Sequence, residues 1–197
     1  MYVNFSALEL ADSQLPQVLS KALLRHGLRA AQLGIEIVED NLEDTDIAHL
    51  LRRLRGLGHP LSIDDFGTGY SSLSRLVDLP VDMIKIGRSF TAGIPDDTRR
   101  VGVIDAILNI ANALTIQIIA EGVETSEQQQ HLAAAGAHLL QGYLTGRPQS
   151  AAELEQRLAA AGVPAQRSAD TEPGYTRPVA NRVTHAAPSS IVEISAT

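Results

Sequence analysis

The chain has 197 residues, which suits one domain of ordinary size followed by a tail. Its formal net charge of −7 argues against a protein that binds the phosphate backbone of DNA or RNA, and its aromatic content of 4% argues against one that stacks single-stranded bases. It contains no cysteine, no apolar run near the roughly 20 residues of a membrane helix and no signal-peptide pattern, so we expect a soluble cytoplasmic protein without disulfides, a zinc–thiolate site or a membrane segment.

Short apolar runs alternate with longer helical patterns up to about residue 161. The apolar runs predict strands near residues 2–4, 33–38, 60–64, 83–86, 117–121 and 138–141. The longer patterns predict helices at residues 21–32, 47–57, 71–77, 99–114, 126–135 and 152–161. Three glycines near predicted helix ends are expected to take left-handed conformations: Gly34, Gly58 and Gly136. This alternation predicts βα units and a parallel sheet.

The predicted strands all finish at or beside a polar residue. These residues are, in chain order, Asn4, Glu36, Asp64, Lys85, Glu121 and Gln141. A (βα) barrel brings the carboxyl ends of all its strands to one face, whereas a doubly wound open sheet needs polar groups only where its strand order reverses. No Gly-rich dinucleotide-binding pattern follows any strand. We therefore predict an α/β fold, a partial TIM (βα) barrel with about six of the eight βα units, whose two remaining units would precede the first strand.

The composition changes beyond about residue 163. Residues 164–197 are rich in Ala, Ser, Thr, Pro and Arg and show no periodicity. The apolar run at residues 191–194 is too short to alter that pattern. We expect a barrel domain at residues 1–163 and a disordered carboxyl-terminal tail at residues 164–197.

Two adjacent carboxylates mark the end of the third predicted strand. The apolar run at residues 60–63 leads directly into Asp64 and Asp65, and a loop with Gly67 and Gly69 follows. Neighbouring carboxylates repel each other unless a cation lies between them or solvent screens them. The pattern therefore suggests a site for a hard metal ion. The alternative is a turn in which Asp65 caps the next helix.

Together, the residues at the strand ends offer only oxygen ligands and one fixed cation, Lys85. Such a set suits Mg²⁺ or Mn²⁺, and two such ions with a lysine could promote attack on a phosphodiester. Each signal has a simpler alternative, because a single Glu at a strand end is more often a cap or a surface residue. Glu39 and Glu124, each three residues past a strand-end Glu, could simply open helices.

Several motifs, in this order, resemble those of EAL-domain cyclic di-GMP phosphodiesterases. They are Asn4-Phe5-Ser6, Glu36-Ile37-Val38-Glu39, Asp64-Asp65-Phe66-Gly67-Thr68-Gly69-Tyr70-Ser71-Ser72, Lys85-Ile86, Ala120-Glu121-Gly122-Val123-Glu124-Thr125 and Gln141-Gly142-Tyr143. The resemblance extends from Val3 to about Pro148. It implies a modified TIM barrel that cleaves cyclic di-GMP to linear pGpG in bacterial second-messenger signalling, with two Mg²⁺ or Mn²⁺ ions.

The resemblance also implies a role for individual residues. The metal ligands would be Asn4, Glu36, Asp64, Asp65 and Glu121, and Glu121 could instead serve as the general base. Lys85 would hold the attacking water or the phosphate, and Gln141 would hold a water or the substrate. The supporting residues would be Glu39, Glu124, Gly67, Thr68 and Gly69, with Glu39 anchoring the loop after Asp65. That loop and the next helix often form the dimer contact in such proteins, so we expect a homodimer or other self-association.

The chain departs from the family pattern in two ways. The Glu-Ala-Leu segment that names the family lies upstream of the Asn-x-Ser segment, and no such segment precedes Asn4 here. The family usually has Lys-Ile-Asp where this chain has Lys85-Ile86-Gly87. Both departures remove a carboxylate, so we expect slow or no hydrolysis. The alternatives are an inactive module that binds cyclic di-GMP or a protein partner, and a gene fragment that folds poorly alone.

Overall fold

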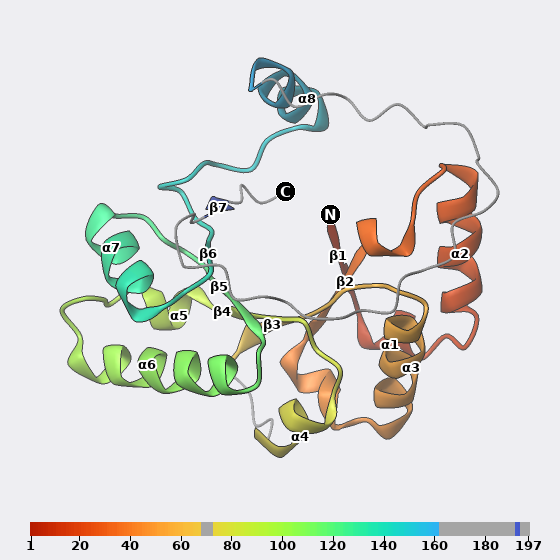
Figure 1. Cartoon of the computed structure of the whole chain (residues 1–197), viewed down its shortest axis with the longest axis horizontal. Helices are drawn as coiled ribbons and strands as arrows, with labels where there is room; N and C mark the ends of the chain where they lie inside the picture. The colour runs from red at the N-terminus through yellow and green to blue at the C-terminus, as the bar shows by residue number, and fades with distance from the viewer. Residues whose placement is uncertain (68–72, 162–191, 194–197) are drawn as a thin grey trace.

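The computed structural model describes residues 1–67, 73–161 and 192–193. Its centre is one parallel sheet whose strands lie side by side in chain order (Figure 1). The strands are β1 (Tyr2–Phe5), β2 (Gly34–Val38), β3 (Leu61–Phe66), β4 (Met83–Ile86), β5 (Gln117–Ala120), β6 (Leu139–Leu140) and β7 (Val192–Glu193). Within the described residues, β1 and β7 are the two edges and do not pair, so the sheet is not closed.

Helices lie between successive strands in the chain, as is usual where neighbouring strands are parallel. The α-helices are α1 (Ala7–Leu10), α2 (Leu15–Arg25), α3 (Thr45–Gly56), α4 (Leu73–Asp78), α5 (Arg88–Thr91), α6 (Thr98–Ala113), α7 (Ser126–Ala135) and α8 (Ala151–Ala160). Two 3₁₀ helices, η1 (Ala30–Gln32) and η2 (Glu39–Glu43), flank β2. In Figure 1, α1 to α3 lie on the β1 and β2 side of the sheet, and α5 to α7 lie on the β5 and β6 side.

Several helices begin where a polar side chain caps their first turn. Asp44 accepts hydrogen bonds from the first N–H groups of α3, and Asp97 does the same for α6. Ser6 and Thr125 form capping boxes at α1 and α7. The longer helices α2, α3 and α6 bury apolar residues in a core that includes the fully buried Ile37 of β2, whereas α8 buries none. Because aromatic residues are few, this core depends on Ile, Leu, Val and Ala.

The predicted helix at residues 21–32 is wrong in its position. The structure has α2 at Leu15–Arg25 instead, and Pro16 lies in its first turn, where a missing N–H costs nothing. The helix ends before Gly27, which has a φ of 64°. The expectation for Gly34 also fails, because this residue begins β2 and does not have a positive φ. Gly58 and Gly136 do have positive φ angles, of 100° and 98°.

Most of the predicted tail lies outside the described residues. The exceptions are Val192 and Glu193, which form β7 and pair in parallel with Leu139 and Leu140 of β6. The expectation of a disordered tail at residues 164–197 stays a prediction.

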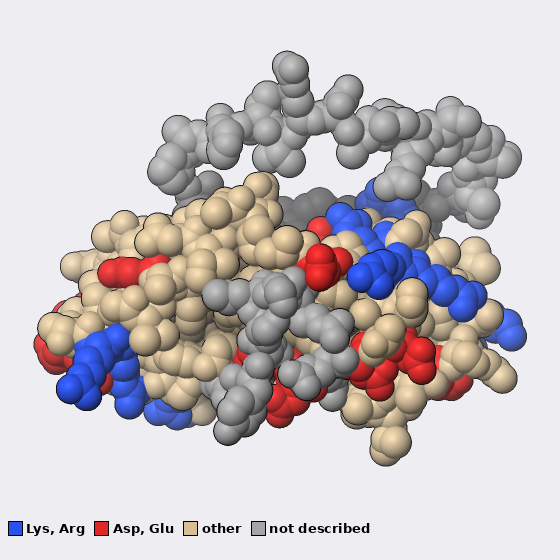
Figure 2. Space-filling model, turned by 90° about the horizontal axis from the view of Figure 1, so that it is seen from below, with Lys and Arg blue, Asp and Glu red and all other residues tan. Residues whose placement is uncertain are grey.

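Two surface properties bear on possible partners. In the described part of the chain, no helix is long and apolar enough to cross a membrane. On the face shown in Figure 2, basic side chains gather at the lower left and the upper right, and acidic side chains lie in several separate groups across the face. The part of that face that is described thus carries no continuous basic surface.

One glycine allows two loops at the end of the sheet to touch. A Cβ built on Gly142 would lie 2.2 Å from the carbonyl oxygen of Val123 and 2.3 Å from its nitrogen. Neither backbone atom can yield without moving the loop after β5. Only a residue without a side chain fits here, which fixes the loop after β6 against the loop after β5.

We expect Gly142→Ala to destabilise the protein by about 1–3 kcal/mol, because the added methyl group overlaps backbone atoms. The control is Gly102→Ala on α6, where an added Cβ meets no atom within 4 Å. That change should stabilise by about 0.5–1 kcal/mol, since Gly is a poor helix former. Urea unfolding measures both effects, and equal midpoints for Gly142→Ala and the parent would contradict the packing described.

Candidate active site

The side-chain ammonium of Lys85 lies among carboxylates from three other strand ends. Its Nζ is 2.5 Å from Glu36 Oε1, 2.5 Å from Glu121 Oε1 and 3.1 Å from Asp64 Oδ1. Lys85 is 8% exposed and Glu36 is 6% exposed, so water screens these charges poorly. The structure thus brings together four of the residues predicted from strand ends, with three formal negative charges around one positive charge.

The sheet register explains why these side chains meet. Side chains alternate between the two faces of a strand, and parallel strands end at the same edge. Ile63 and Ile84 pair across β3 and β4 and are fully buried, which turns Asp64 and Lys85 to the opposite face of the sheet. The structure therefore needs no unusual backbone to collect these charges at one edge.

Asp65 reaches the same region through an irregular backbone. The register of β3 and β4 shifts between Ile63 and Phe66, as in a β-bulge, and Asp65 has a φ of 53°. Few residues other than glycine adopt that conformation, and Asp is among those that tolerate it best. Consecutive side chains of a regular strand point to opposite faces of the sheet. The bulge instead lets the carboxylates of Asp64 and Asp65 lie close together.

Carboxylate oxygens of Asp64, Asp65 and Glu121 lie within 4.8 Å of one another. Such a group of hard oxygen ligands fits a divalent cation such as Mg²⁺, Mn²⁺ or Ca²⁺. Asp65 Oδ1 also lies where a side chain at position 87 would begin, because a Cβ built on Gly87 would be only 2.7 Å from it. The glycine therefore leaves room for the Asp65 carboxylate.

The burial of these charges shifts their proton affinities. Burial lowers the pKa of Lys85, but its hydrogen bonds to Glu121 and Glu36 raise it by more, so the ammonium stays charged. Burial raises the pKa of Glu121 and of Glu36, and the hydrogen bond from Lys85 offsets this only in part. One ammonium cannot neutralise three carboxylates, so both glutamates hold a proton more readily than free Glu does.

The remaining predicted residues lie around this centre. Asn4 is on β1 in register with Glu36, and its side chain is exposed. Glu39 is buried, and its Oε2 accepts a hydrogen bond from the Gly67 N–H at 2.8 Å, so it holds the start of the loop after Asp65. Thr68 and Gly69 lie outside the described residues.

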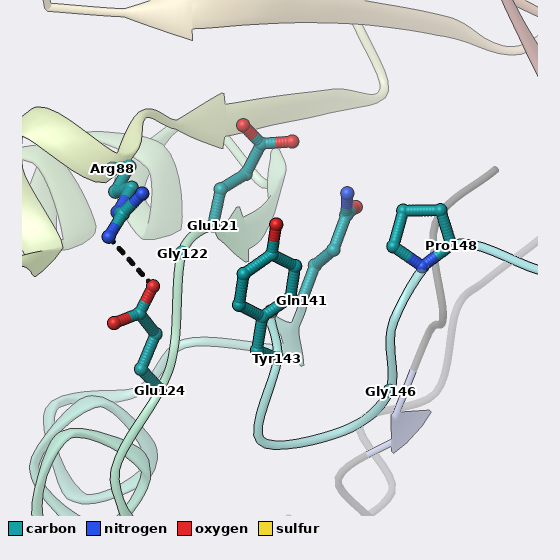
Figure 3. Close-up of a pocket in the computed structure, with 9 residues that line it drawn as sticks. Arg88, Glu121, Gly122, Glu124, Gln141, Tyr143, Gly146 and Pro148 are labelled. Carbon is teal, nitrogen blue, oxygen red and sulfur yellow. Dashed lines mark ion pairs between the residues drawn. The ribbon is translucent and has the colours of Figure 1, made fainter.

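A pocket of about 270 Å³ opens beside Glu121 (Figure 3). Glu121 and Gln141 follow neighbouring strands, and their side chains point to the same side of the pocket together with Tyr143. At the left of Figure 3, Arg88 and Glu124 also line the pocket and form an ion pair at 2.8 Å. The pocket thus places donors, acceptors and an aromatic ring next to the carboxylate centre, as a polar ligand with a flat ring would require.

Sequence reasoning missed several residues that shape the site. Arg88 lines the pocket, while Thr91 and Gln128 are buried below the loop after β5. The pattern Thr125-x-x-Gln128 is typical of a helix capping box and could have indicated Gln128. No local pattern marked Thr91, because α5 is only four residues long.

A family model for the EAL domain matches residues 1–148. The chain belongs to the EAL domain family. The structure is similar to that of PaMucR phosphodiesterase in its c-di-GMP complex, with a TM-score of 0.74 and 40% identity over 78% of this chain and 63% of that one. This likeness confirms the predicted fold class, an α/β partial (βα) barrel.

Two other relatives indicate the chemistry found in this family. Cyclic di-GMP phosphodiesterase NbdA of Pseudomonas aeruginosa is 44% identical over 162 residues, which cover 80% of this chain and 20% of NbdA. The manganese/cy-diGMP complex of Klebsiella pneumoniae BlrP1 has a TM-score of 0.68 and 32% identity over 73% of this chain and 37% of that chain. The chain spans about a fifth of the length of the first curated relatives it matches.

In the metal-free protein, we expect Glu121 to make folding stability fall as the pH rises above 4.5, the ordinary pKa of Glu. The folded protein has the higher pKa and binds the proton more tightly than the unfolded chain does. This contribution is therefore complete below pH 4.5 and is lost as the pH rises through the folded pKa.

Urea unfolding in EDTA at increasing pH tests this expectation. Glu121→Gln should flatten the fall in stability, because the amide cannot ionise. Glu155→Gln, which changes an exposed carboxyl on α8, is the control and should follow the parent. A Glu121→Gln curve parallel to that of the parent would show that folding does not raise the pKa of the Glu121 carboxyl.

Proposed function

We propose that this chain is a cyclic di-GMP phosphodiesterase domain that hydrolyses cyclic di-GMP to pGpG with Mg²⁺ or Mn²⁺. The observation that carries the proposal is the grouping of Asp64, Asp65 and Glu121 beside Lys85, at the carboxyl edge of a parallel sheet and next to a pocket. The family membership supports it, because relatives such as NbdA are named for this activity.

The metal ions would be held by Asp64, Asp65 and Glu121, with Glu36 and Asn4 at the side of the site. When bound, such ions polarise a phosphodiester and lower the pKa of a nearby water. The ligand set supports this assignment, since carboxylate oxygens grouped within 4.8 Å of one another are the ligands that hard divalent cations prefer.

The residues of the chain have distinct roles in this proposal. The Lys85 ammonium holds a phosphate oxygen or the attacking water, and its raised pKa keeps it charged for that task. Glu121 accepts the proton of the attacking water, since its carboxylate lies beside Lys85 and lines the pocket. Gln141 and Tyr143 line the pocket beside Glu121 and contact the bound nucleotide.

The alternative is a module that binds cyclic di-GMP or a protein partner without cleaving the nucleotide. Gly87 favours it, because the family pattern implies a carboxylate at this position and glycine supplies none. A weaker ligand set would slow hydrolysis and leave nucleotide binding in place. We therefore expect hydrolysis to be slow.

Further expectations about partners and location stay predictions. The separate acidic and basic groups in Figure 2 support a small ligand over a DNA or RNA polymer. Val77 on α4 is 65% exposed and would suit a contact in a homodimer or other self-associated form. A cytoplasmic location stays an expectation.

Turnover of cyclic di-GMP with Mg²⁺ or Mn²⁺, followed by chromatography of pGpG, tests the proposal. We expect hydrolysis below the usual kcat range of about 1–10³ per second and its loss in Glu121→Gln, which removes the proposed base. Glu155→Gln is the control and should keep the parent rate. Nucleotide binding without any turnover would establish a cyclic di-GMP-binding module, and the absence of both would refute hydrolysis and nucleotide binding together.

Substitutions at position 87 separate the steric effect of a side chain from the effect of its charge. Gly87→Ala should weaken Mn²⁺ binding, because its Cβ displaces the Asp65 carboxylate and adds no ligand. Gly87→Asp should bind Mn²⁺ about 10–100-fold more tightly than Gly87→Ala, since it adds an oxygen ligand at the same steric cost. Calorimetric titration measures both affinities, and equal values would exclude position 87 from the metal environment.

A further inference from the structure

The backbone of Glu121 is held from both sides by other elements. Its N–H donates to the carbonyl of Ile86 at the end of β4 at 3.0 Å. Its own carbonyl accepts a hydrogen bond of 2.5 Å from the hydroxyl of Thr91 on α5. Thr91 is fully buried, so water cannot replace this bond without opening the core.

The side chain of Gln128 links this contact to the rest of the loop after β5. Its Oε1 accepts hydrogen bonds from the N–H groups of Glu124 at 2.7 Å and Thr125 at 3.1 Å. Its Nε2 donates to the carbonyl of Thr91 at 3.1 Å. Gln128 is 6% exposed, so its side-chain amide makes these three hydrogen bonds with protein groups and not with water.

The chemistry of the amide separates two tasks. Capping α7 requires only an acceptor, and a glutamate could serve in the same capping box. Binding the Thr91 carbonyl requires a donor, which a carboxylate lacks. The Nε2 bond is therefore not needed for the helix cap, and its effect is to fix α5 against the loop that begins with Glu121.

We propose that Gln128, through Thr91, is a positioning residue that keeps the Glu121 carboxylate in place beside Lys85 and the metal ligands. The catalytic part of this inference rests on the proposed function. A catalytic carboxylate must be held within a fraction of an ångström, and residues that orient ligands typically change metal affinity or activity by about 10–100-fold. The Glu121–Lys85 contact depends on the same anchoring whether or not the chain hydrolyses cyclic di-GMP.

Two pairs of variants of the full chain test the proposal. Thr91→Val removes the hydroxyl at almost constant shape, whereas Thr91→Ser keeps it. Gln128→Glu keeps the acceptor for the cap and removes the donor to Thr91. Gln130→Glu makes the same chemical change at an exposed position of α7 and is its control.

The first measurement is the NMR signal of the Lys85 ammonium in metal-free protein, which reports its contact with Glu121. Thr91→Val and Gln128→Glu should shift this signal and speed exchange of the Lys85 ammonium protons with water. The second is Mn²⁺ titration, in which these two variants should bind about 10–100-fold more weakly than the parent. Thr91→Ser and Gln130→Glu should match the parent in both.

The outcomes separate the inference from the proposed function. Folded Thr91→Val and Gln128→Glu with the parent's Lys85 signal would overturn the inference, whatever the enzymatic result. A parent that binds neither Mn²⁺ nor cyclic di-GMP would refute the proposed function, and the Lys85 signal would still decide the positioning role. In active protein, a lower kcat with an unchanged KM would further support that role, whereas equal kcat values in Thr91→Val and Thr91→Ser would contradict it.

Discussion

The ion pairs of the Lys85 ammonium hold the strand ends of the site together. Carboxylates from β2, the end of β3 and the loop after β5 converge on this one cation. Without it, three negative charges at low exposure would repel each other and favour an open edge of the sheet. The same excess of negative charge makes the site attractive to divalent cations, because one ammonium cannot balance it.

Short, tightly packed loops give this charged centre its shape. Gly122 has a φ of 67°, and a Cβ there would lie 2.4 Å from the Arg88 side chain. Gly142 lies against the backbone of Val123 in the same way. The loops after β5 and β6 therefore stand close together, and the pocket between Glu121, Gln141 and Tyr143 follows from that contact.

Gly87 illustrates how one substitution changes both charge and space. It follows β4 two residues after Lys85, where the family pattern implies an aspartate. Its missing side chain removes a possible metal ligand and also lets the Asp65 carboxylate approach. Asp65, which has a left-handed backbone conformation, is the carboxylate nearest to position 87. The loss of metal affinity caused by Gly87 therefore depends on whether Asp65 binds the metal in place of the missing ligand.

Local sequence patterns determined the order of the elements and much of the candidate site. Apolar runs that end in polar residues are local signals, and parallel strands necessarily bring Glu36, Asp64 and Lys85 to one edge. The structure has α2 earlier than the predicted residues 21–32, because Pro16 is accepted in the first turn of a helix, where its missing N–H has no partner to lose.

Only the tertiary structure decided how those residues contact one another. Which carboxylates share Lys85 depends on the curvature and register of the sheet, and sequence periodicity does not specify either. Gln128 bonds to Thr91 across 37 positions of the chain, and Thr91 bonds to Glu121 across 30. Such contacts leave no mark in a local window, because each depends on the packing of α5 and α7 against the end of β5.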